Sequence, residues 1–259
     1  MKDKTDKYTI EKKELPNLPL RMIINGSSGC GKSSLLGWLL CQEKELGYKN
    51  DFKPENIYIF SGSLKMEDGE PKGDYKLSKM IEYLKIPEEN IFDNFDNDIM
   101  NELYDNLVDE FNESIDEKEK PEHKLIIMDD LGYQNKTNKS RVEDSSIDKL
   151  FCNGRKYLIS TIILNQRIIQ ANRTCLANAS AVVLYKPNNQ DLEVYESNFN
   201  YLKDKKQFKN MVREHTKTKH NFLCIDFTKD DIYRNDEFQP ILICKCGKGK
   251  NDCGLEKYD

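Results

Sequence analysis

A short glycine-rich run near the N-terminus combines the residue types that bind a polyphosphate. Residues 26–33 read Gly-Ser-Ser-Gly-Cys-Gly-Lys-Ser and fit the pattern G-x-x-x-x-G-K-[ST]. Glycines let the backbone wrap closely around phosphates, so that several N–H groups donate at once. Lys32 would reach the β- and γ-phosphates, and Ser33 would offer its hydroxyl to Mg²⁺. The predicted nucleotide-binding residues are Gly26, Ser27, Ser28, Gly29, Cys30, Gly31, Lys32, Ser33 and Ser34.

Two carboxylates follow an apolar run later in the chain, where residues 125–130 read Leu-Ile-Ile-Met-Asp-Asp. A continuous apolar run is typical of a strand buried on both faces, and ligands bind at the carboxyl ends of such strands. After a phosphate-binding loop, this pattern predicts a Walker B strand. Asp129 would hold Mg²⁺, and Asp130 would orient or polarise the attacking water. The alternative is a strand end whose acids are only solvated.

A third group of polar side chains follows another apolar run, at residues 159–164. This run ends in Asn165, Gln166 and Arg167. An amide at the tip of a strand beside the Walker B strand can contact the γ-phosphate or the attacking water. Gln166 or Asn165 is therefore the candidate sensor of the γ-phosphate, unless the amide only caps the strand end.

Strand and helix patterns alternate along the chain, which favours a parallel sheet with right-handed crossovers. The sequence thus predicts an α/β fold, with a mostly parallel central sheet flanked by helices. The expected strands are 20–25, 56–60, 125–130, 159–164, 181–185, 222–227 and 240–244. The expected helices are 34–40, 75–84, 99–115, 145–158, 188–199 and 203–213.

Length and composition indicate one large globular domain, or one domain with a small appendage, in a chain of 259 residues. We expect an N-terminal arm outside the core at 1–18, an ATPase domain at 19–227, and a C-terminal strand with a mobile tail at 228–259. No apolar run approaches the roughly 20 residues that span a bilayer, and no signal-peptide core is present. These features predict an intracellular protein that does not contact a membrane.

The cysteines and histidines show no strong metal-ligand spacing. The eight cysteines are scattered, which favours reduced thiols. Cys244, Cys246 and Cys253, with Cys224, match a zinc site poorly. Cys30 would lie at a helix N-terminus, a position that lowers a thiol pKa, and we expect thiol reagents to block nucleotide binding. His123, His215 and His220 are expected at the surface.

Several segments together resemble the genome-packaging ATPases of large DNA viruses and virophages, a branch of the FtsK–HerA superfamily. The phosphate loop and the strand Ile-Ile-Met-Asp-Asp-Leu are two of them. The others are Asn-Gly-Arg-Lys at 153–156, the strand with its Asn-Gln end at 159–166, Asn-Arg-Thr at 172–174, and residues 178–185. The resemblance covers about residues 20–227.

The resemblance implies an additional-strand P-loop NTPase core, a homo-oligomeric ring, and ATP-driven translocation of double-stranded DNA into a capsid. The implied partner is a capsid or portal-like vertex protein, and the implied location is the host cytoplasm, the viral factory or the virion. Arg155 matches the family's Gly-Arg-His arginine and is the first candidate for the finger that completes a neighbour's site. Arg173 is second and Arg167 third. This chain has Lys156 where the family often has His.

The densest basic segment is the candidate DNA contact, since Lys and Arg grip phosphates. Its members are Lys203, Lys205, Lys206, Lys209, Arg213, Lys217 and Lys219. The net charge of −5 argues mildly against a nucleic-acid binder, but a local basic patch can still act because other charges are screened. The alternative for this segment is a solvated face.

Other functions remain open for the same motifs. A DNA helicase or segregation motor would share every catalytic residue. A nucleotide-gated assembly module with little turnover would keep the loop but hydrolyse ATP slowly. A small-molecule kinase would need an arginine-rich lid and a substrate pocket, and neither is evident in the sequence.

Overall fold

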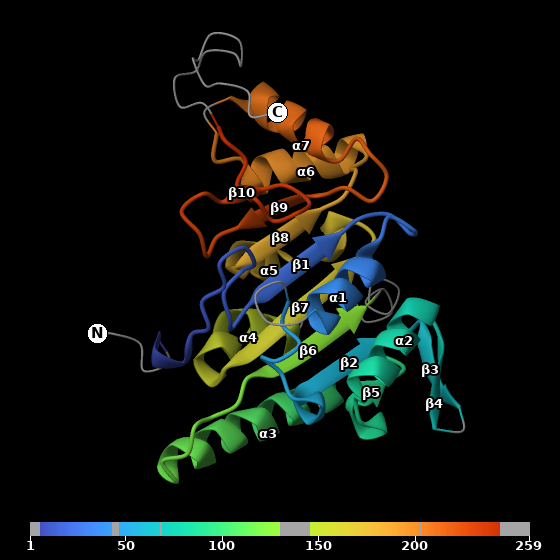
Figure 1. The fold of residues 1–259 in the computed structure, drawn as a ribbon, viewed down its shortest axis with the longest axis vertical. Coiled ribbons are helices and arrows are strands. Elements are labelled where there is room, and N and C mark those ends of the chain that lie inside the picture. Colours follow the sequence, from blue (N-terminus) through green and yellow to red (C-terminus); the bar gives the residue numbers. More distant parts are fainter. Residues whose placement is uncertain (1–5, 43–46, 68, 130–145, 203, 244–259) are drawn as a thin grey trace.

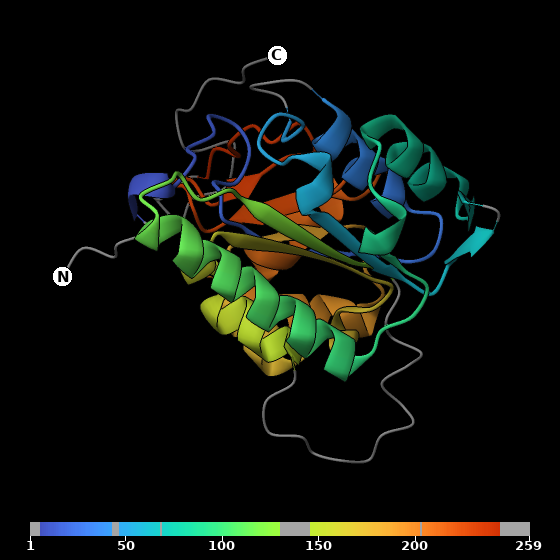
Figure 2. The same cartoon turned by 90° about the horizontal axis from the view of Figure 1, so that it is seen from below.

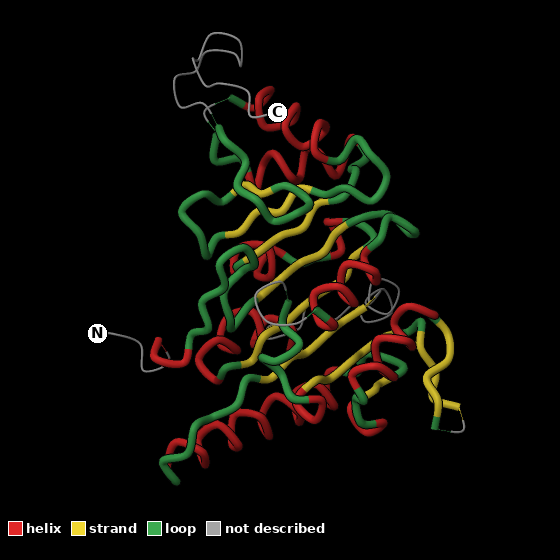
Figure 3. The backbone as a smooth tube through the Cα atoms, viewed as in Figure 1, coloured by secondary structure: helices red, strands yellow, loops and turns green. Residues whose placement is uncertain are grey.

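A computed structural model describes residues 6–42, 47–67, 69–129, 146–202 and 204–243. Its centre is an eight-stranded sheet with the order β10-β9-β8-β1-β7-β6-β2-β5 (Figure 1). The strands are β1 Arg21–Asn25, β2 Ile57–Ser61, β5 Ile91–Phe92, β6 Lys124–Asp129, β7 Ile159–Asn165, β8 Ala181–Leu184, β9 Leu223–Asp226 and β10 Tyr233–Arg234. A separate antiparallel hairpin joins β3 Leu64–Glu67 to β4 Glu70–Gly73 (Figure 3).

The strand order defines the type of α/β fold. Strands β8, β1, β7, β6, β2 and β5 run parallel, whereas β9 and β10 pair antiparallel at one edge. Strand β7 lies between β1, which leads into the glycine-rich loop, and β6, which carries the acids. This inserted strand confirms the predicted additional-strand core with a mostly parallel sheet.

Helices cover both faces of the sheet, as the continuous apolar strands require. Helices α1 Lys32–Cys41 and α2 Tyr75–Leu84 cover one face, and α3 Asn97–Asp116 and α4 Ser146–Asn153 cover the other (Figure 2). Helices α5 Arg173–Asn178, α6 Asn189–Phe199 and α7 Lys205–His215 complete the second face. Short 3-10 turns span Asp6–Tyr8, Pro54–Asn56, Glu88–Asn90, Gly154–Tyr157 and Ile168–Gln170. None of the helices in these described ranges is both long and apolar enough to cross a membrane.

Two of the expected elements differ from the structure. The helix expected at 145–158 ends at Asn153 and continues as a 3-10 turn, because Gly154 weakens the helix and Leu158 adopts a left-handed φ of 58°. The strand expected at 240–244 is reduced, within the described residues, to one bridge between Pro240 and Arg234. Proline has no N–H to donate to a ladder, so it limits pairing at this edge.

Four short elements were not expected: the β3–β4 hairpin, β5, β10 and α5. Strands β5 and β10 have two residues each. Such short runs carry no readable alternation, and they are fixed by pairing with β2 and β9. Their existence depends on tertiary contacts.

The N-terminal arm packs against the core, contrary to expectation. Leu15 and Leu18 are buried in the same apolar cluster as α1, and the hydroxyl of Tyr48 donates to the Pro16 carbonyl at 2.7 Å. His123 is also buried, and its Nε2 lies 2.9 Å from the Tyr8 carbonyl oxygen. The arm therefore covers apolar surface that the sheet and α1 leave open, while the domain boundaries stay predictions.

Candidate active site

The glycine-rich loop joins β1 to α1 at the carboxyl edge of the sheet, and its geometry requires its glycines. A Cβ on Gly26 would lie 2.6 Å from both Cys30 Sγ and Tyr185 Cβ. Gly29 and Gly31 have φ values of 73° and 117°, which L side chains rarely adopt. Gly31 is the N-cap of α1 and supplies no side-chain cap. The first N–H groups of α1 are therefore placed to bind an anion.

Lys32 folds against this loop. Its Nζ donates to the carbonyl oxygen of Gly26 at 2.7 Å and to that of Ser27 at 3.2 Å. The ammonium group thus lies beside the N–H groups of the loop, where it adds positive charge to an anion site.

Asp129 ends β6 as a buried carboxylate held by two hydroxyls. Its Oδ2 accepts hydrogen bonds from Ser61 Oγ at 3.0 Å and from Ser63 Oγ at 3.1 Å. Ser61 is the register partner of Asp129 on β2. The side chain of Asp129 is therefore oriented by the neighbouring strand and by the turn that follows it.

A continuous hydrogen-bonded path connects Asp129 to the phosphate loop. Beyond Ser63, the Ser63 carbonyl accepts from the backbone N of Asp74 at 3.1 Å. Asp74 Oδ2 in turn accepts from Ser33 Oγ at 3.2 Å. Gly73 permits this approach, since a Cβ there would lie 2.0 Å from the Ser63 carbonyl oxygen. The carboxylate of Asp129 and the hydroxyl of Ser33 therefore belong to one hydrogen-bond network.

Asp74 is a site residue that sequence reasoning missed. Its Oδ1 accepts from the backbone N atoms of Lys76 and Leu77, so Asp74 is also the N-cap of α2. The cap was readable as an Asp directly before an amphipathic helix. Its contact with Ser33 was not readable, because it depends on how α2 packs beside α1.

The residues of this network fit a magnesium ion. Ser33 and Asp129 offer hydroxyl and carboxylate oxygens, which are the hard ligands that Mg²⁺ prefers, and Asp74 adds a carboxylate beside Ser33. Asp130, the expected catalytic acid, lies outside the described residues.

The two candidate sensor amides lie at the end of β7, one in its last residue and one directly after it. Asn165 is buried, and its register partner on β1 is Asn25. Side chains alternate along a strand, so Asn165 shares the face of Ile163, away from α1. Gln166 follows directly and is half-buried. Gln166 lies beyond the last residue of β7, so strand alternation does not fix the direction of its side chain, and its sensor role stays a prediction.

The three candidate finger arginines lie at different places around the sheet. Arg155 is exposed in the 3-10 turn that precedes β7, at the amino edge. Arg167 follows β7 at the carboxyl edge, where its Nη2 donates to Gln190 Oε1 at 2.7 Å. Arg173 is exposed in the first turn of α5. The length of β7 separates Arg155 from the loop of its own subunit by about 20 Å.

Burial has the largest effect on the pKa of the Cys30 thiol in the loop. Burial raises the pKa of the Cys30 thiol, and this effect outweighs the nearby charge of Lys32 and the backbone hydrogen bonds, which lower it. The expectation that the helix N-terminus would lower this pKa is therefore wrong.

The basic segment forms α7 and the turn after it. Lys205 and Lys209 make ion pairs with Glu196 and Glu193 of α6. These carboxylates within the same subunit partly neutralise the two ammonium groups. The other described basic side chains of the segment are exposed: Lys206, Arg213, Lys217 and Lys219. The turn continues to His220, whose Nδ1 lies 2.9 Å from the Cys30 carbonyl oxygen. Lys203 lies outside the described residues, as do Cys244, Cys246 and Cys253.

The strand order and the loop geometry together define a P-loop NTPase of the additional-strand type. Comparison with protein families identifies the particular group. Residues 7–244 match the model described as Poxvirus A32 protein, and the chain belongs to that family. This confirms the resemblance to genome-packaging ATPases of large DNA viruses. A comparison with curated protein sequences gave no significant match.

Solved structures share the fold at low sequence identity. The DNA-packaging ATPase B204 from Sulfolobus turreted icosahedral virus is 14% identical with a TM-score of 0.53, covering 87% of this chain and 99% of that one. The genome-packaging NTPase B204 from Sulfolobus turreted icosahedral virus 2, in complex with AMP, is 16% identical with a TM-score of 0.52, over 86% and 98%. The pCW3 conjugation coupling protein TcpA, with ATPγS, is 18% identical with a TM-score of 0.52, over 90% and 69%.

Proposed function

We propose that this protein hydrolyses ATP at the carboxyl edge of its sheet. The observation that carries the proposal is the network from Ser33 through Asp74 and Ser63 to Asp129, which joins the glycine-rich loop to the acid at the end of β6. Mg²⁺ bound there would neutralise phosphate charge. Lys32 and the N–H groups of the loop bind the β- and γ-phosphates. B204 from Sulfolobus turreted icosahedral virus 2 crystallised with AMP and AMPPCP, which supports nucleotide binding by this fold.

The residues around the γ-phosphate have separate roles in this proposal. Asp130, directly after β6, orients or polarises the attacking water, and Gln166 senses the γ-phosphate from the end of β7. Arg155 acts on the nucleotide of a neighbouring subunit, because β7 separates it from its own loop. A head-to-tail ring would bring the amino edge of one subunit to the carboxyl edge of the next.

We infer that hydrolysis drives double-stranded DNA into a capsid, with the chain acting as an oligomeric ring at a capsid or portal-like vertex protein. Membership of the poxvirus A32 family and the fold shared with two viral packaging proteins support this function. The setting would be the host cytoplasm, the viral factory or the virion. A helicase or segregation motor would use the same site, and an assembly module would bind ATP with little turnover.

The deciding experiment measures ATP hydrolysis with and without double-stranded DNA for the wild type, Lys32→Ala, Arg155→Ala and the control Lys156→Ala. We expect DNA to stimulate the wild type and Lys156→Ala, and either of the other substitutions to abolish turnover. An equimolar mixture of Lys32→Ala and Arg155→Ala should regain activity, because one subunit supplies the arginine and the next supplies the intact loop. A rate of ATP hydrolysis that is the same with and without DNA would contradict the proposed DNA motor. A mixture that regains no activity would exclude Arg155 as the finger.

A capsid-loading assay separates packaging from the other DNA motors. Purified empty capsids with this ATPase and ATP should make added DNA resistant to nuclease, and Lys32→Ala should not. DNA unwinding without protected DNA would favour the helicase alternative.

A further inference from the structure

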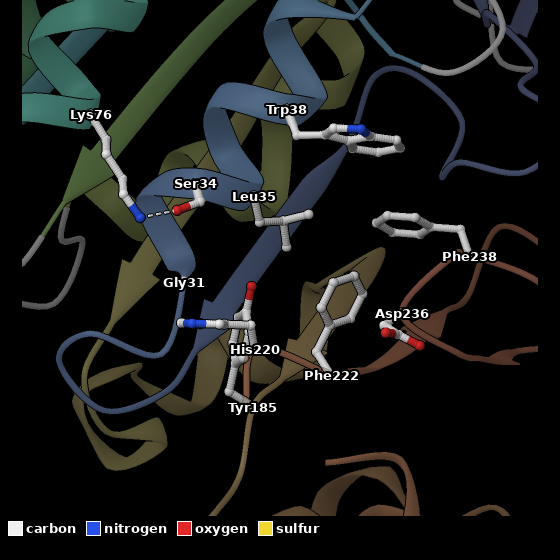
Figure 4. A pocket seen from close by; sticks show the side chains of 10 residues that line it. All are labelled: Gly31, Ser34, Leu35, Trp38, Lys76, Tyr185, His220, Phe222, Asp236 and Phe238. Atoms are coloured by element: carbon white, nitrogen blue, oxygen red, sulfur yellow. Dashed lines mark hydrogen bonds between the residues drawn. The ribbon is translucent and has the colours of Figure 1, made fainter. Parts of the chain in front are cut away.

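A pocket of about 480 Å³ opens directly beside the phosphate loop (Figure 4). One wall is helix α1 with Lys76 of α2 beside it, and the other wall comes from Tyr185, directly after β8, and from the segments that flank β9 and β10. Its aromatic members are Trp38, Tyr185, Phe222 and Phe238. The lining residues are Gly31, Ser34, Leu35, Trp38, Lys76, Tyr185, His220, Phe222, Asp236 and Phe238.

The pocket wall formed by α1 is continuous with the candidate phosphate site. Gly31, Ser34, Leu35 and Trp38 are spaced by three and four residues, so they share one face of the helix. This face begins at the N-cap, where the phosphates would bind, and ends at the indole of Trp38. A nucleotide whose phosphates occupy the loop would therefore extend its nucleoside along this face. This step rests on the proposed binding of ATP.

The aromatic walls suit a flat heterocyclic base. Phe222 and Phe238 are buried, while Trp38 is 37% exposed. The rings of Trp38 and Phe238 are nearly parallel, with an angle of 6° and centroids 5.9 Å apart. The exposed part of the indole is available for stacking against a base.

Asp236 is the one carboxylate among the polar lining side chains, which also include Ser34, Lys76 and His220. Asp236 lies on the turn after β10 and is half-buried, and no hydrogen bond or ion pair to its side chain occurs among the residues that the structure describes. A carboxylate only accepts hydrogen bonds, so it pairs with an amino group and repels a carbonyl oxygen. Adenine presents such an amino group at C6.

We propose that this pocket binds the adenine base of ATP and that Asp236 determines base specificity by accepting a hydrogen bond from the 6-amino group. The base stacks against Trp38, and the phosphates extend from the ribose into the loop at Gly31. Selection of the base thus comes from the C-terminal segment around β10, outside the phosphate-binding motif.

The first test uses Trp38, the only tryptophan in the chain, as a fluorescence reporter. Titration with ATP should quench or shift the emission, whereas inorganic tripolyphosphate should bind without doing so. Calorimetry detects tripolyphosphate binding independently and thereby reports on the phosphate loop alone. If both ligands bind and ATP leaves the emission unchanged, the base does not occupy this pocket and the ATPase proposal stands. If neither ligand binds, both proposals fail.

The second test asks whether Asp236 recognises the 6-amino group of adenine. Binding of ATP is compared with that of purine riboside triphosphate, which lacks the 6-amino group, in the wild type, Asp236→Ala and the control Glu237→Ala. The wild type and Glu237→Ala should prefer ATP by about tenfold, the size expected for one hydrogen bond to a charged group. Asp236→Ala should bind both ligands equally. A preference for ATP that survives in Asp236→Ala would overturn the assignment.

Discussion

At the scale of single residues, burial changes the chemistry of the cysteine inside the phosphate loop. The thiolate is the reactive form, and burial raises the pKa of Cys30, so little thiolate is present at neutral pH. We predict that iodoacetamide modifies Cys30 more slowly at pH 7.5 than the exposed Cys152, and that the rate rises at alkaline pH. Mass spectrometry of peptides from one reaction compares the two sites. Faster modification of Cys30 at pH 7.5 would mean that the helix N-terminus dominates.

The half-buried Cys30 thiol can also report on nucleotide binding. Cys30 follows Gly29 in the loop that would wrap the phosphates, so a bulky maleimide attached there should abolish ATP binding. Cys30→Ser treated with the same reagent should retain binding. Unchanged ATP affinity of the maleimide-modified wild type would show that the loop does not enclose the phosphates.

His123 makes the stability of the fold depend on pH. Burial lowers the pKa of His123, although its hydrogen bond to the Tyr8 carbonyl and the charge of Asp51 oppose this, and Lys120 adds to it. The unfolded chain therefore binds a proton more readily than the folded one as the pH falls below about 6.5. We predict a loss of unfolding free energy between pH 7.5 and pH 5.5 that is smaller in His123→Gln, measured by urea unfolding. His215→Gln is the control, and an equal loss in all three proteins would exclude His123 as the cause.

At the scale of elements, the N-cap of α2 is a residue of the candidate active site. Asp74 caps α2 and accepts from Ser33, whereas Asp96 caps α3 in the same way on the other face of the sheet. Replacing either cap by alanine should cost about 1 kcal/mol of stability. Only Asp74→Ala should also weaken the Mg²⁺-dependent part of ATP affinity, by about tenfold, because Ser33 loses the group that orients it.

The paired variants make this prediction specific. ATP titrations with and without Mg²⁺, read from Trp38 fluorescence or by calorimetry, give the metal-dependent part for each variant. If Asp74→Ala and Asp96→Ala lose stability equally and both keep the wild-type Mg²⁺ dependence, Asp74 is a helix cap only.

At the scale of the whole molecule, charge is distributed unevenly. The acidic α3 covers the β6 side of the sheet, while α7 and its basic turn lie beside α6 toward the β9 edge (Figure 1). We predict that Lys217→Ala with Lys219→Ala weakens binding of double-stranded DNA. The slope of log Kd against log salt should fall by about 2, near one unit for each lost phosphate contact.

A double variant of equal charge controls for the net charge of the molecule. Lys118→Ala with Lys120→Ala changes two exposed lysines beyond the end of α3. Fluorescence anisotropy of labelled DNA at several salt concentrations compares the two pairs. Equal slopes would show that the basic turn is a solvated face.

Much of the fold was readable because its strands are long apolar runs and its main helices are amphipathic. The α2 helix matched its expected bounds of 75–84, and β1, β2, β6, β7 and β8 each lie within one residue of expectation. The phosphate loop and Asp129 were readable because a polyphosphate and its metal demand fixed residue types at fixed spacing. Leu15, Leu18 and His123 were misplaced, since their burial depends on where a polar arm docks.

The sequence alone therefore determined the class of protein and predicted the residues of its candidate phosphate site, because both follow from local patterns. The tertiary structure alone decided which distant residues join that site. Asp74 reaches Ser33 through the packing of α2 beside α1, and Asp236 reaches the pocket through the pairing of β10 with β9. It also placed Arg155 at the edge opposite its own loop, since the direction and length of β7 exist only once the sheet has formed.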